Sequence, residues 1–427
     1  MVSKADELLR QDAQSAAVSS AQWAVLATIA LMGLALRLAF LDRNNLDLVD
    51  HFLPWLDQIR SEGFWQALSR PFSEYVYTHF YSYAIGLANA LLPEGTDGKA
   101  VIKSVSIAFD YIAAGLALAI ARLRWPGGWQ PVAVFAAILF APTVVLNGAY
   151  WGQSDIVYTS FLLACVYLLL RGSDALAMVC FGVALAIKLQ AAWLGPFILM
   201  MMIRGNIRWH LAILPPLVYL ILAFPALVSG RALIEVATIY LTQAGTQSML
   251  TMAAANLHFF PQYFLYHLGW WPDALPHIAK AAIVFTGVLG LVFAWRASRG
   301  RLTEEALIIA ALVAALILPQ FLPHMHNRYF FTADIMAIVL AAWRPAYWPA
   351  ALLMQFNSGV TYISFLWHEP LLAHAVPGWL AVFGFTNNLQ WVTGLEALAG
   401  LLNFALLLWF WRRLLALQSI GSPVGAR

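Results

Sequence analysis

Long apolar runs separated by polar turns dominate the chain. Many of these runs have the length of roughly 20 residues that an α-helix needs to cross a bilayer. Since a spanning segment must satisfy its own backbone groups, the pattern predicts an all-α polytopic membrane protein with about twelve transmembrane helices. We place these spans at residues 22–41, 104–121, 129–146, 154–170, 175–190, 191–203, 209–228, 276–295, 303–322, 329–343, 346–367 and 389–411.

Arginines in the turns predict the orientation. Positive residues concentrate on the cytoplasmic side of membrane proteins. With the N-terminus and C-terminus in the cytoplasm, every predicted inner turn carries arginine, at Arg122, Arg124, Arg171, Arg204, Arg208, Arg296, Arg299, Arg301, Arg344, Arg412 and Arg413. This orientation requires that the short, Tyr-rich segment 78–92 lies in the outer interface, because a span there would invert the pattern.

The turns differ greatly in length. Long outer segments lie at 42–103, 229–275 and 368–388, and residues 1–20 form a polar tail in the cytoplasm. We expect the first outer segment to form helices beside the membrane. No stretch resembles a soluble domain, so residues 1–427 read as one transmembrane domain. One boundary stays open, since Gly195-Pro196 could kink a single helix over 175–203.

Composition narrows the possible classes of protein. The chain has 427 residues, 62% of them hydrophobic and 11% charged, which excludes an ordinary soluble domain. A net charge of +3 without a basic block gives no indication of nucleic-acid binding. Cys165 and Cys180 both lie in apolar runs, so neither a disulfide framework nor a cysteine metal site is indicated.

Acidic residues gather just after the first span. Asp42, Asp47, Asp50 and Asp57 lie within sixteen residues, close to His51. Desolvation beside a membrane raises the pKa of a carboxyl toward neutral pH, which suits a general base. We assign this catalytic role to Asp50 and a sugar or acceptor contact to Asp47 and His51. The alternative is helix capping, which is the better interpretation for Asp47.

Two further polar groups interrupt apolar runs. In NGAYWGQSDIVYTS, Gln153 and Asp155 suit sugar hydroxyls, although Asp155 could equally be a helix N-cap. Lys188 lies inside GVALAIKLQAAWLGP, where a buried ammonium needs an anionic partner. We expect a phosphate or Asp155 as that partner, with snorkelling to the interface as the alternative.

The turn FLPHMHNRYFFTAD brings cations and an aromatic residue together. Arg328, with its planar fork, matches phosphate geometry, and His324 and His326 flank it. Two histidines two residues apart could instead bind a metal, but no carboxylate accompanies them closely. The third interpretation is that this arginine anchors the protein to lipid headgroups. Arg37, near the outer end of the first span, is a lesser candidate for the same anion.

Amides and aromatic side chains recur in the segment 239–260. Gln243 and Asn256 lie among methionines and aromatic residues, and such surfaces commonly bind sugar rings. Together with Tyr329 they are candidate sugar or acceptor contacts. A loop that rests on the membrane would have a similar composition.

Five stretches carry a family resemblance. They are DLVDHFLPWLDQIRSEG, AYWGQSDIVYTSFLLACVYLLLRG, FGVALAIKLQAAWLGPFILM, IYLTQAGTQSMLTMAAANL and LPHMHNRYFFTADIMAIVLA. They resemble the GT-C superfamily of membrane glycosyltransferases that use polyprenyl-phosphate sugars. Bacterial relatives of the GPI mannosyltransferases and of the dolichyl-phosphate-glucose glucosyltransferases are especially similar. The last stretch is close to the pattern K-M-H-E-R-Y-F-F-P-A-D of that family.

The resemblance implies a GT-C fold and specific roles for the residues that match. The first outer loop would carry the catalytic acid, Asp50, and the HMHNRY turn would bind the donor phosphate through His326 and Arg328. His324 and Asn327 depart from the lysine and the acidic residue of the pattern, which puts the phosphate contacts in doubt. The loop reads D-x-x-D where a metal-binding D-x-D would be needed, so no metal or other cofactor is expected.

The expected activity is inverting transfer of a hexose. The donor would be a polyprenyl-phosphate-linked sugar, with mannose favoured by analogy alone, and the acceptor a glycan or glycolipid. We expect a bacterial inner-membrane protein, in contact with membrane lipids, whose active site faces the periplasm. A transporter or flippase of lipid-linked saccharides is the alternative, although no inner set of polar groups matches the outer set. A structural scaffold is a third reading, which leaves the clustered outer polar groups unexplained.

Overall fold

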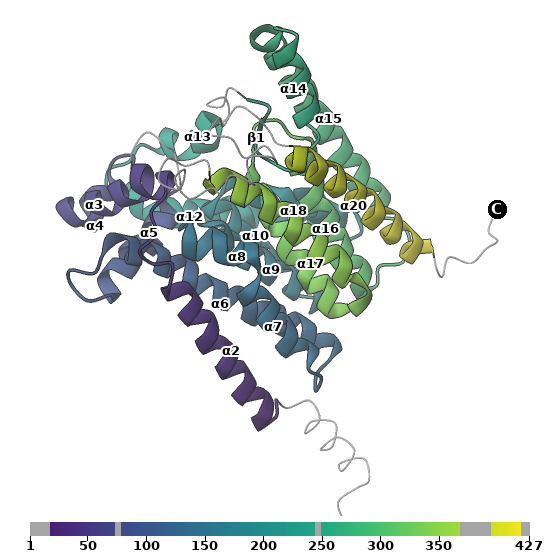
Figure 1. The fold of residues 1–427 in the computed structure, drawn as a ribbon, viewed down its shortest axis with the longest axis horizontal. Coiled ribbons are helices and arrows are strands. Elements are labelled where there is room, and N and C mark those ends of the chain that lie inside the picture. Colours follow the sequence, from purple (N-terminus) through teal and green to yellow (C-terminus); the bar gives the residue numbers. More distant parts are fainter. Residues whose placement is uncertain (1–17, 73–77, 244–248, 368–393, 420–427) are drawn as a thin grey trace, which may run out of the picture.

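Helices account for almost all regular structure in the chain (Figure 1). The computed structural model describes residues 18–72, 78–243, 249–367 and 394–419. Most of the predicted N-terminal tail, the predicted outer segment 368–388 and the side chain of Gln243 lie outside the described residues.

The predicted apolar stretches coincide with helices, which confirms the all-α prediction. These helices are α2 (Ser20–Leu38), α6 (Gly98–Arg124), α7 (Gln130–Phe140), α9 (Asp155–Leu170), α10 (Asp174–Ile187), α11 (Gly195–Ile203), α12 (Leu214–Val228), α15 (Trp271–Ala297), α16 (Glu304–Phe321), α17 (Phe331–Trp343), α18 (Trp348–Trp367) and α20 (Gly394–Ser419). Shorter helices fill the predicted outer segments. These are η1 (Leu48–Phe52), α3 (Leu53–Glu62), α4 (Phe64–Leu68), α5 (His79–Leu91), α13 (Leu233–Gln243) and α14 (Phe259–His267).

Fewer helices than predicted have the length of a membrane span. Within the described ranges, six are long and apolar enough: Ser20–Leu38, Gly98–Arg124, Trp209–Val228, Asp273–Ala297, Glu304–Phe321 and Gly394–Ser419. A seventh is added if the pair Gln130–Phe140 and Pro142–Tyr150, bent by 42°, forms one span. The protein is therefore an integral membrane protein with several spans, and the number twelve stays a prediction. The 13 residues of α5 extend about 20 Å, short of the hydrocarbon core.

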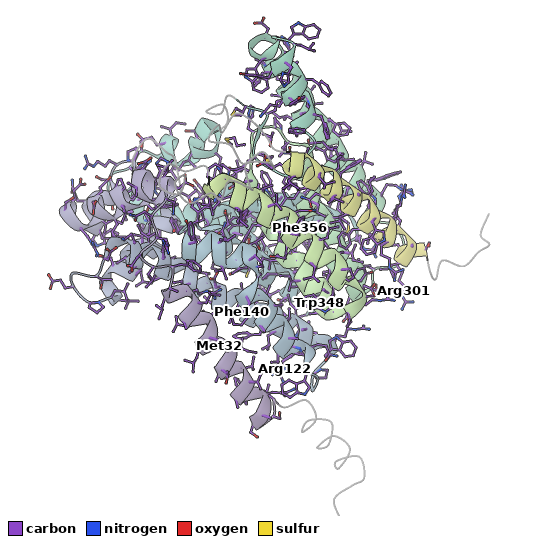
Figure 2. The ribbon with its side chains drawn as sticks, in the orientation of Figure 1. Met32, Arg122, Phe140, Arg301, Trp348 and Phe356 are labelled. Carbon is purple, nitrogen blue, oxygen red and sulfur yellow. The ribbon has the colours of Figure 1, made fainter. Side chains whose placement is uncertain are left out.

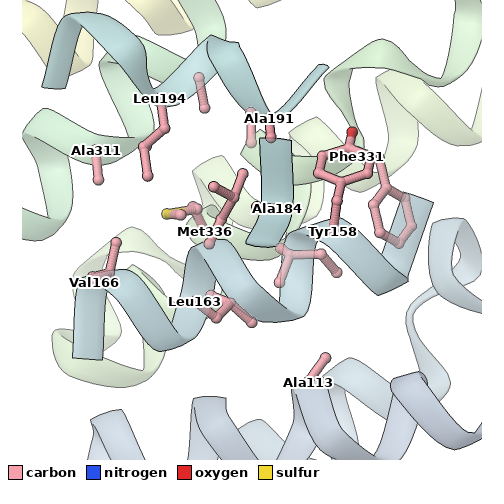
Figure 3. Close-up of a cluster of buried hydrophobic side chains, with 14 of the residues drawn as sticks. Ala113, Tyr158, Leu163, Val166, Ala184, Ala191, Leu194, Ala311, Phe331 and Met336 are labelled. Atoms are coloured by element: carbon pink, nitrogen blue, oxygen red, sulfur yellow. The ribbon is translucent and has the colours of Figure 1, made fainter. Parts of the chain in front are cut away.

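The core forms where apolar helices pack on several sides. Figure 3 shows Tyr158, Leu163 and Val166 of α9 beside Ala184 of α10, Leu194, Ala311 of α16 and Met336 of α17. Helix α16 is buried along most of its length, as expected for a helix that is apolar all round. Peripheral helices instead expose large apolar side chains, such as Met32 and Phe356 (Figure 2), a surface suited to lipid.

The predicted inner turns contact one another. Trp125 Nε1 donates to the carbonyl of Ala342 at 3.1 Å, and Arg204 donates to the carbonyl of Ser298 at 2.6 Å. At the start of α16, the carboxylate of Glu305 receives hydrogen bonds from Arg344. Figure 2 labels three residues of these turns, Arg122, Arg301 and Trp348. Turns that are distant in the sequence are thus joined by hydrogen bonds at this end of the bundle, and the orientation of the chain in the membrane stays a prediction.

Two short strands join the long segment between α12 and α15 to the turn between α16 and α17. β1 (Thr251–Met252) pairs in parallel with β2 (Met325–His326), so that Thr251 lies opposite Met325. Asn256 anchors the segment that follows β1, because its Nδ2 donates to the carbonyl of Pro319 at 3.0 Å. This contact fixes the segment after β1 against the end of α16, just before the turn that carries Arg328.

The break between the predicted spans 175–190 and 191–203 lies at Lys188. This residue is extended (φ −156°, ψ 138°) and is followed by the 3-10 helix η3 (Leu189–Leu194). α11 then begins, with Pro196 in its first turn, where proline is well tolerated. The alternative of a single helix kinked at Gly195-Pro196 is wrong.

Candidate functional site

A strained residue starts the turn that carries Arg328. His324 has φ +62°, a conformation that costs free energy for a residue with a side chain. Its backbone N–H donates to the carbonyl of Leu250 at 2.8 Å, and its Nδ1 donates to that of Met249 at 2.6 Å. The imidazole predicted to bind phosphate thus uses Nδ1 to hold the turn against the outer segment.

The carboxylate of Asp47 lies opposite this turn. It accepts hydrogen bonds from Trp151 Nε1 at 3.0 Å and from Gln153 Nε2 at 2.5 Å, and it lies 3.3 Å from an Arg328 nitrogen. Asp47 makes no side-chain cap. The capping interpretation of Asp47 is therefore wrong: Asn45 Oδ1 accepts the N–H of Leu48 at 2.9 Å and takes that role.

Asp155 forms the second anionic position. It lies in the first turn of α9, fully buried, where the helix dipole favours negative charge. Its Oδ1 lies 2.5 Å from Lys188 Nζ, and its Oδ2 accepts from Asn147 Nδ2 at 2.8 Å. Ser154 occupies the N-cap position, so the N-cap reading of Asp155 is wrong. Lys188 therefore pairs with Asp155, one of the two anionic partners that were expected for it.

Arg328 connects the two anionic positions. Its Nε lies 3.5 Å from Asp155 Oδ2, and a different nitrogen of the guanidinium contacts Asp47. We call Asp47, Asp155, Lys188 and Arg328 the charge cluster. It contains two cations and two carboxylates, drawn from four separate parts of the chain. Charge-assisted N–H···O bonds are usually 2.7–2.9 Å long, so the contacts of Arg328 are long ones.

Aromatic side chains surround the guanidinium of Arg328. Its Cζ lies 5.2 Å from the ring of Trp151 and 6.0 Å from that of Tyr329, distances that allow cation–π attraction. Trp151 in turn stacks on Phe365, with ring centroids 5.1 Å apart. These rings limit water around the positive charge and thereby strengthen its attraction for an anion.

Burial decreases from Asp155 toward Asp47. The side chains of Asp155 and Lys188 are 0% and 6% exposed, whereas that of Asp47 is 23% exposed. The charge cluster is therefore open to its surroundings at Asp47 and closed at Asp155.

His326 lies beside Arg328 as a neutral group. Its Nδ1 donates to Asn327 Oδ1, and the amide of Asn327 is oriented by donation to the carbonyl of Thr361 at 3.2 Å. Burial, together with the nearby Arg328, holds the pKa of His326 well below its usual value. His326 can therefore form hydrogen bonds to a ligand, but it does not supply positive charge near neutral pH.

Other predicted site residues lie apart from the charge cluster. Asp50 is exposed on η1, next to the half-buried His51, and none of the described contacts joins it to Arg328. Arg37 is fully buried in an ion pair with Asp110, at 2.7 Å between α2 and α6. It is not available to a phosphate, so that prediction is wrong. Asn256 is buried and bonded to backbone.

Two contributors to the site, Trp151 and Asn45, were not among the predicted site residues, and Asn147 was noted only as part of its polar stretch. Trp151, Asn147 and Asn45 contact or orient the members of the charge cluster. Trp151 and Asn147 lie in the polar stretch that was singled out, and a tryptophan between two glycine-flanked polar residues was the available signal. Nothing in the sequence marked Asn45. Among the residues that the structure describes, no group of three His, Cys, Asp or Glu side chains could hold a metal ion.

Comparisons with known proteins place the chain among membrane glycosyltransferases. The sequence profile of a family described as glycosyltransferase family 87 matches residues 75–322, more than half of the chain. A solved structure of ArnT from Cupriavidus metallidurans bound to undecaprenyl phosphate superposes with a TM-score of 0.54 at 14% identity. The match covers 94% of this chain and 78% of that one, so the two share a fold. The comparison with curated proteins gave no match.

Proposed function

The chain belongs to glycosyltransferase family 87, and on that premise we propose that it transfers a hexose from a polyprenyl-phosphate sugar to a hydroxyl acceptor. The favoured hexose is mannose, and the acceptor is a lipid-linked or envelope glycan. ArnT, whose fold this chain shares, was solved with undecaprenyl phosphate, which supports a lipid-phosphate donor. The site would face the periplasm from the bacterial inner membrane.

One observation carries the proposal: Arg328 lies between Asp47 and Asp155, with Lys188 beside it. Both of these carboxylate contacts are longer than ordinary charge-assisted hydrogen bonds, so a phosphate oxygen at a shorter distance would be the stronger partner. A donor phosphate would compete with Asp47 for the fork of Arg328, because the planar guanidinium matches phosphate oxygens. Asp155, closed off and buried, would keep both cations in place during this exchange.

Displacement of Asp47 from Arg328 would leave its carboxylate free to act as a base. Asp47 would accept the proton of the acceptor hydroxyl while that oxygen attacks the anomeric carbon. The bond from the anomeric carbon to the phosphate oxygen breaks on the opposite face, and its electron pair leaves with the polyprenyl phosphate. Arg328 and Lys188 would stabilise the negative charge that develops there.

Two carboxylates of the first outer loop compete for the role of base. The family pattern assigned it to Asp50, and the geometry supports Asp47, because Asp47 is the one in contact with Arg328. The residues are three positions apart, so matched Asp47→Asn and Asp50→Asn substitutions distinguish them. Both variants change one carboxylate to an amide of the same shape.

The test is transfer in a purified system. Each variant is reconstituted in nanodiscs and given radiolabelled undecaprenyl-phosphate mannose or undecaprenyl-phosphate glucose, with an envelope glycan extract as acceptor. We expect Asp47→Asn to lower turnover by about 10²–10⁴-fold, the usual contribution of a general base, while Asp50→Asn stays within about tenfold of wild type. The reverse order would assign the base to Asp50, and full activity in both would exclude this mechanism.

The same reconstitution separates a transferase from a transporter or flippase. Labelled sugar that crosses a vesicle bilayer without forming a covalent product would favour transport. Covalent product on the glycan extract would favour transfer.

A further inference from the structure

The short helix η3 carries two buried polar side chains on one face. A 3-10 helix has three residues per turn, so side chains three positions apart lie above one another. Gln190 and Trp193 are three apart in η3, and they are 9% and 6% exposed. They therefore share one side of the segment that begins directly after Lys188.

Each of these side chains has a buried polar atom without a hydrogen-bond partner. Among the described residues, Gln190 Oε1 and Trp193 Nε1 are both in this state. A buried polar group left unpaired costs free energy. The pair presents one acceptor and one donor, which is the complement of two sugar hydroxyls.

This face lies next to the charge cluster. The ring of Trp193 contacts that of Tyr329 edge-on, with centroids 6.1 Å apart, and the ring of Tyr329 lies 6.0 Å from Arg328 Cζ. At the other end of η3, Lys188 pairs with Asp155. One proposed counter-ion of a phosphate, Arg328, thus lies beside the ring of Tyr329, and the other, Lys188, directly precedes η3 in the chain.

We propose that Gln190 and Trp193 bind the hexose that is transferred and select it by its hydroxyl groups. This assignment rests on the proposed function, since it takes Arg328 and Lys188 to hold the phosphate to which that hexose is attached. Gln190 Oε1 accepts a hydrogen bond from one sugar hydroxyl, and Trp193 Nε1 donates to another. The rings of Trp193 and Tyr329 contact the C–H face of the sugar.

Both side chains would act on the sugar and not on the lipid phosphate. A site built to bond a substrate hydroxyl discriminates strongly against an analogue that lacks it. The contribution of Gln190 and Trp193 should therefore appear as the ratio of two affinities, for undecaprenyl phosphate with and without a hexose.

The experiment measures both affinities for the reconstituted protein. The probes are undecaprenyl phosphate, undecaprenyl-phosphate mannose and undecaprenyl-phosphate glucose. Wild type should bind one of the two sugar-bearing probes at least tenfold more tightly than the sugar-free one. Trp193→Phe keeps a ring but removes the N–H, and it should cut that ratio by about tenfold, the worth of one such hydrogen bond. Gln190→Leu, of similar size, should do the same.

A matched control is available in α17. Trp343 is also buried with an unpartnered Nε1, but it lies at the end of its helix among the inner turns. Trp343→Phe should leave the ratio unchanged, and all variants should bind the sugar-free lipid as wild type does.

Each remaining outcome overturns a stated claim. An unchanged ratio in both Trp193→Phe and Gln190→Leu would overturn the sugar assignment and leave the phosphate assignment intact. Wild type that binds the sugar-free lipid but does not distinguish it from either sugar-bearing probe would do the same. Failure of wild type to bind any of the three lipids would refute the proposed function, and the sugar assignment with it.

Discussion

Two buried arginines in this protein have opposite surroundings. Arg37 lies between α2 and α6, where Nε donates to Asp110 at 2.7 Å and another nitrogen donates to the carbonyls of Gly33 and Leu139. Arg328 contacts Asp47 and Asp155 at 3.3 and 3.5 Å. Both are cations in an apolar protein, but Arg37 has a short bond to one carboxylate, whereas Arg328 lies between two carboxylates at longer distances.

On the proposed function, the difference separates an ion pair that holds helices together from a cluster that binds a ligand. Arg37 and Asp110 are each 0% exposed, so nothing can replace either partner without unfolding part of the bundle. Arg328 lies next to the half-exposed end of its cluster, and contacts of catalytic groups are often long before substrate binds. Buried charge alone therefore does not mark a site in this chain, and the proposal for Arg328 depends on its position between two carboxylates.

The largest effect on stability should come from breaking the ion pair between Arg37 and Asp110. Arg37→Leu leaves the carboxylate of Asp110 buried without its cation, and we expect a loss of about 3–5 kcal/mol in stability. Thermal unfolding in detergent measures it. The double variant Arg37→Leu/Asp110→Leu should recover most of the loss, because no charge is left unpaired. A single variant as stable as wild type would contradict the structural role.

Replacing Arg328 should have the opposite result, with a small loss of stability and a large loss of activity. Without it, Asp155 keeps Lys188 and Asp47 keeps Trp151, so Arg328→Ala should unfold within a few degrees of wild type. Loss of charge stabilisation at the leaving phosphate should lower kcat/KM by about 10²–10³-fold, or roughly 3–4 kcal/mol. Steady-state kinetics should show a larger change in the KM of the lipid donor than of the acceptor. Equal changes would argue against phosphate binding.

A buried histidine, for which the described part of the chain gives no hydrogen-bond partner to either ring nitrogen, sharpens the comparison. Burial and the nearby Arg231 lower the pKa of His79 to about 4, from 6.5 for an ordinary histidine. Between these values the unfolded chain binds a proton that the folded chain does not, so stability falls as pH decreases from about 6.5 to about 4, by up to about 3 kcal/mol. Thermal unfolding at pH 7.5 and pH 5 should show this loss in wild type and a smaller one in His79→Gln. Equal losses in both would contradict the assignment to His79.

The smallest effect concerns the turn that positions Arg328. His324→Gly relieves the positive φ but removes the hydrogen bond to Met249, so we expect a net loss of about 1 kcal/mol or less. His324→Ala keeps the strain and loses the bond, and it should be less stable by about 1 kcal/mol more. Unfolding midpoints of the two variants give the comparison. Alanine that is as stable as glycine would show that the positive φ is not strained.

Much of the helical framework could be predicted from the apolar runs. Within the described residues, each predicted stretch corresponds to helix, because a chain in lipid has to bond its own backbone groups. The turn around Arg328 and the need of Lys188 for an anion could also be predicted, since a polar group at that depth requires a partner. These conclusions depend on residue type and local pattern alone.

The tertiary structure decided which polar groups meet. An ordinary helix would place Asp47 and Asp50 on one face, but the chain between them winds as a π-helix, with Asp47 half-buried toward Arg328 and Asp50 exposed. Arg37 looked like an anion site until Asp110, 73 residues away in sequence, proved to be its partner. Such pairings depend on how helices pack across the bundle, and contacts between distant segments leave no local pattern in the sequence.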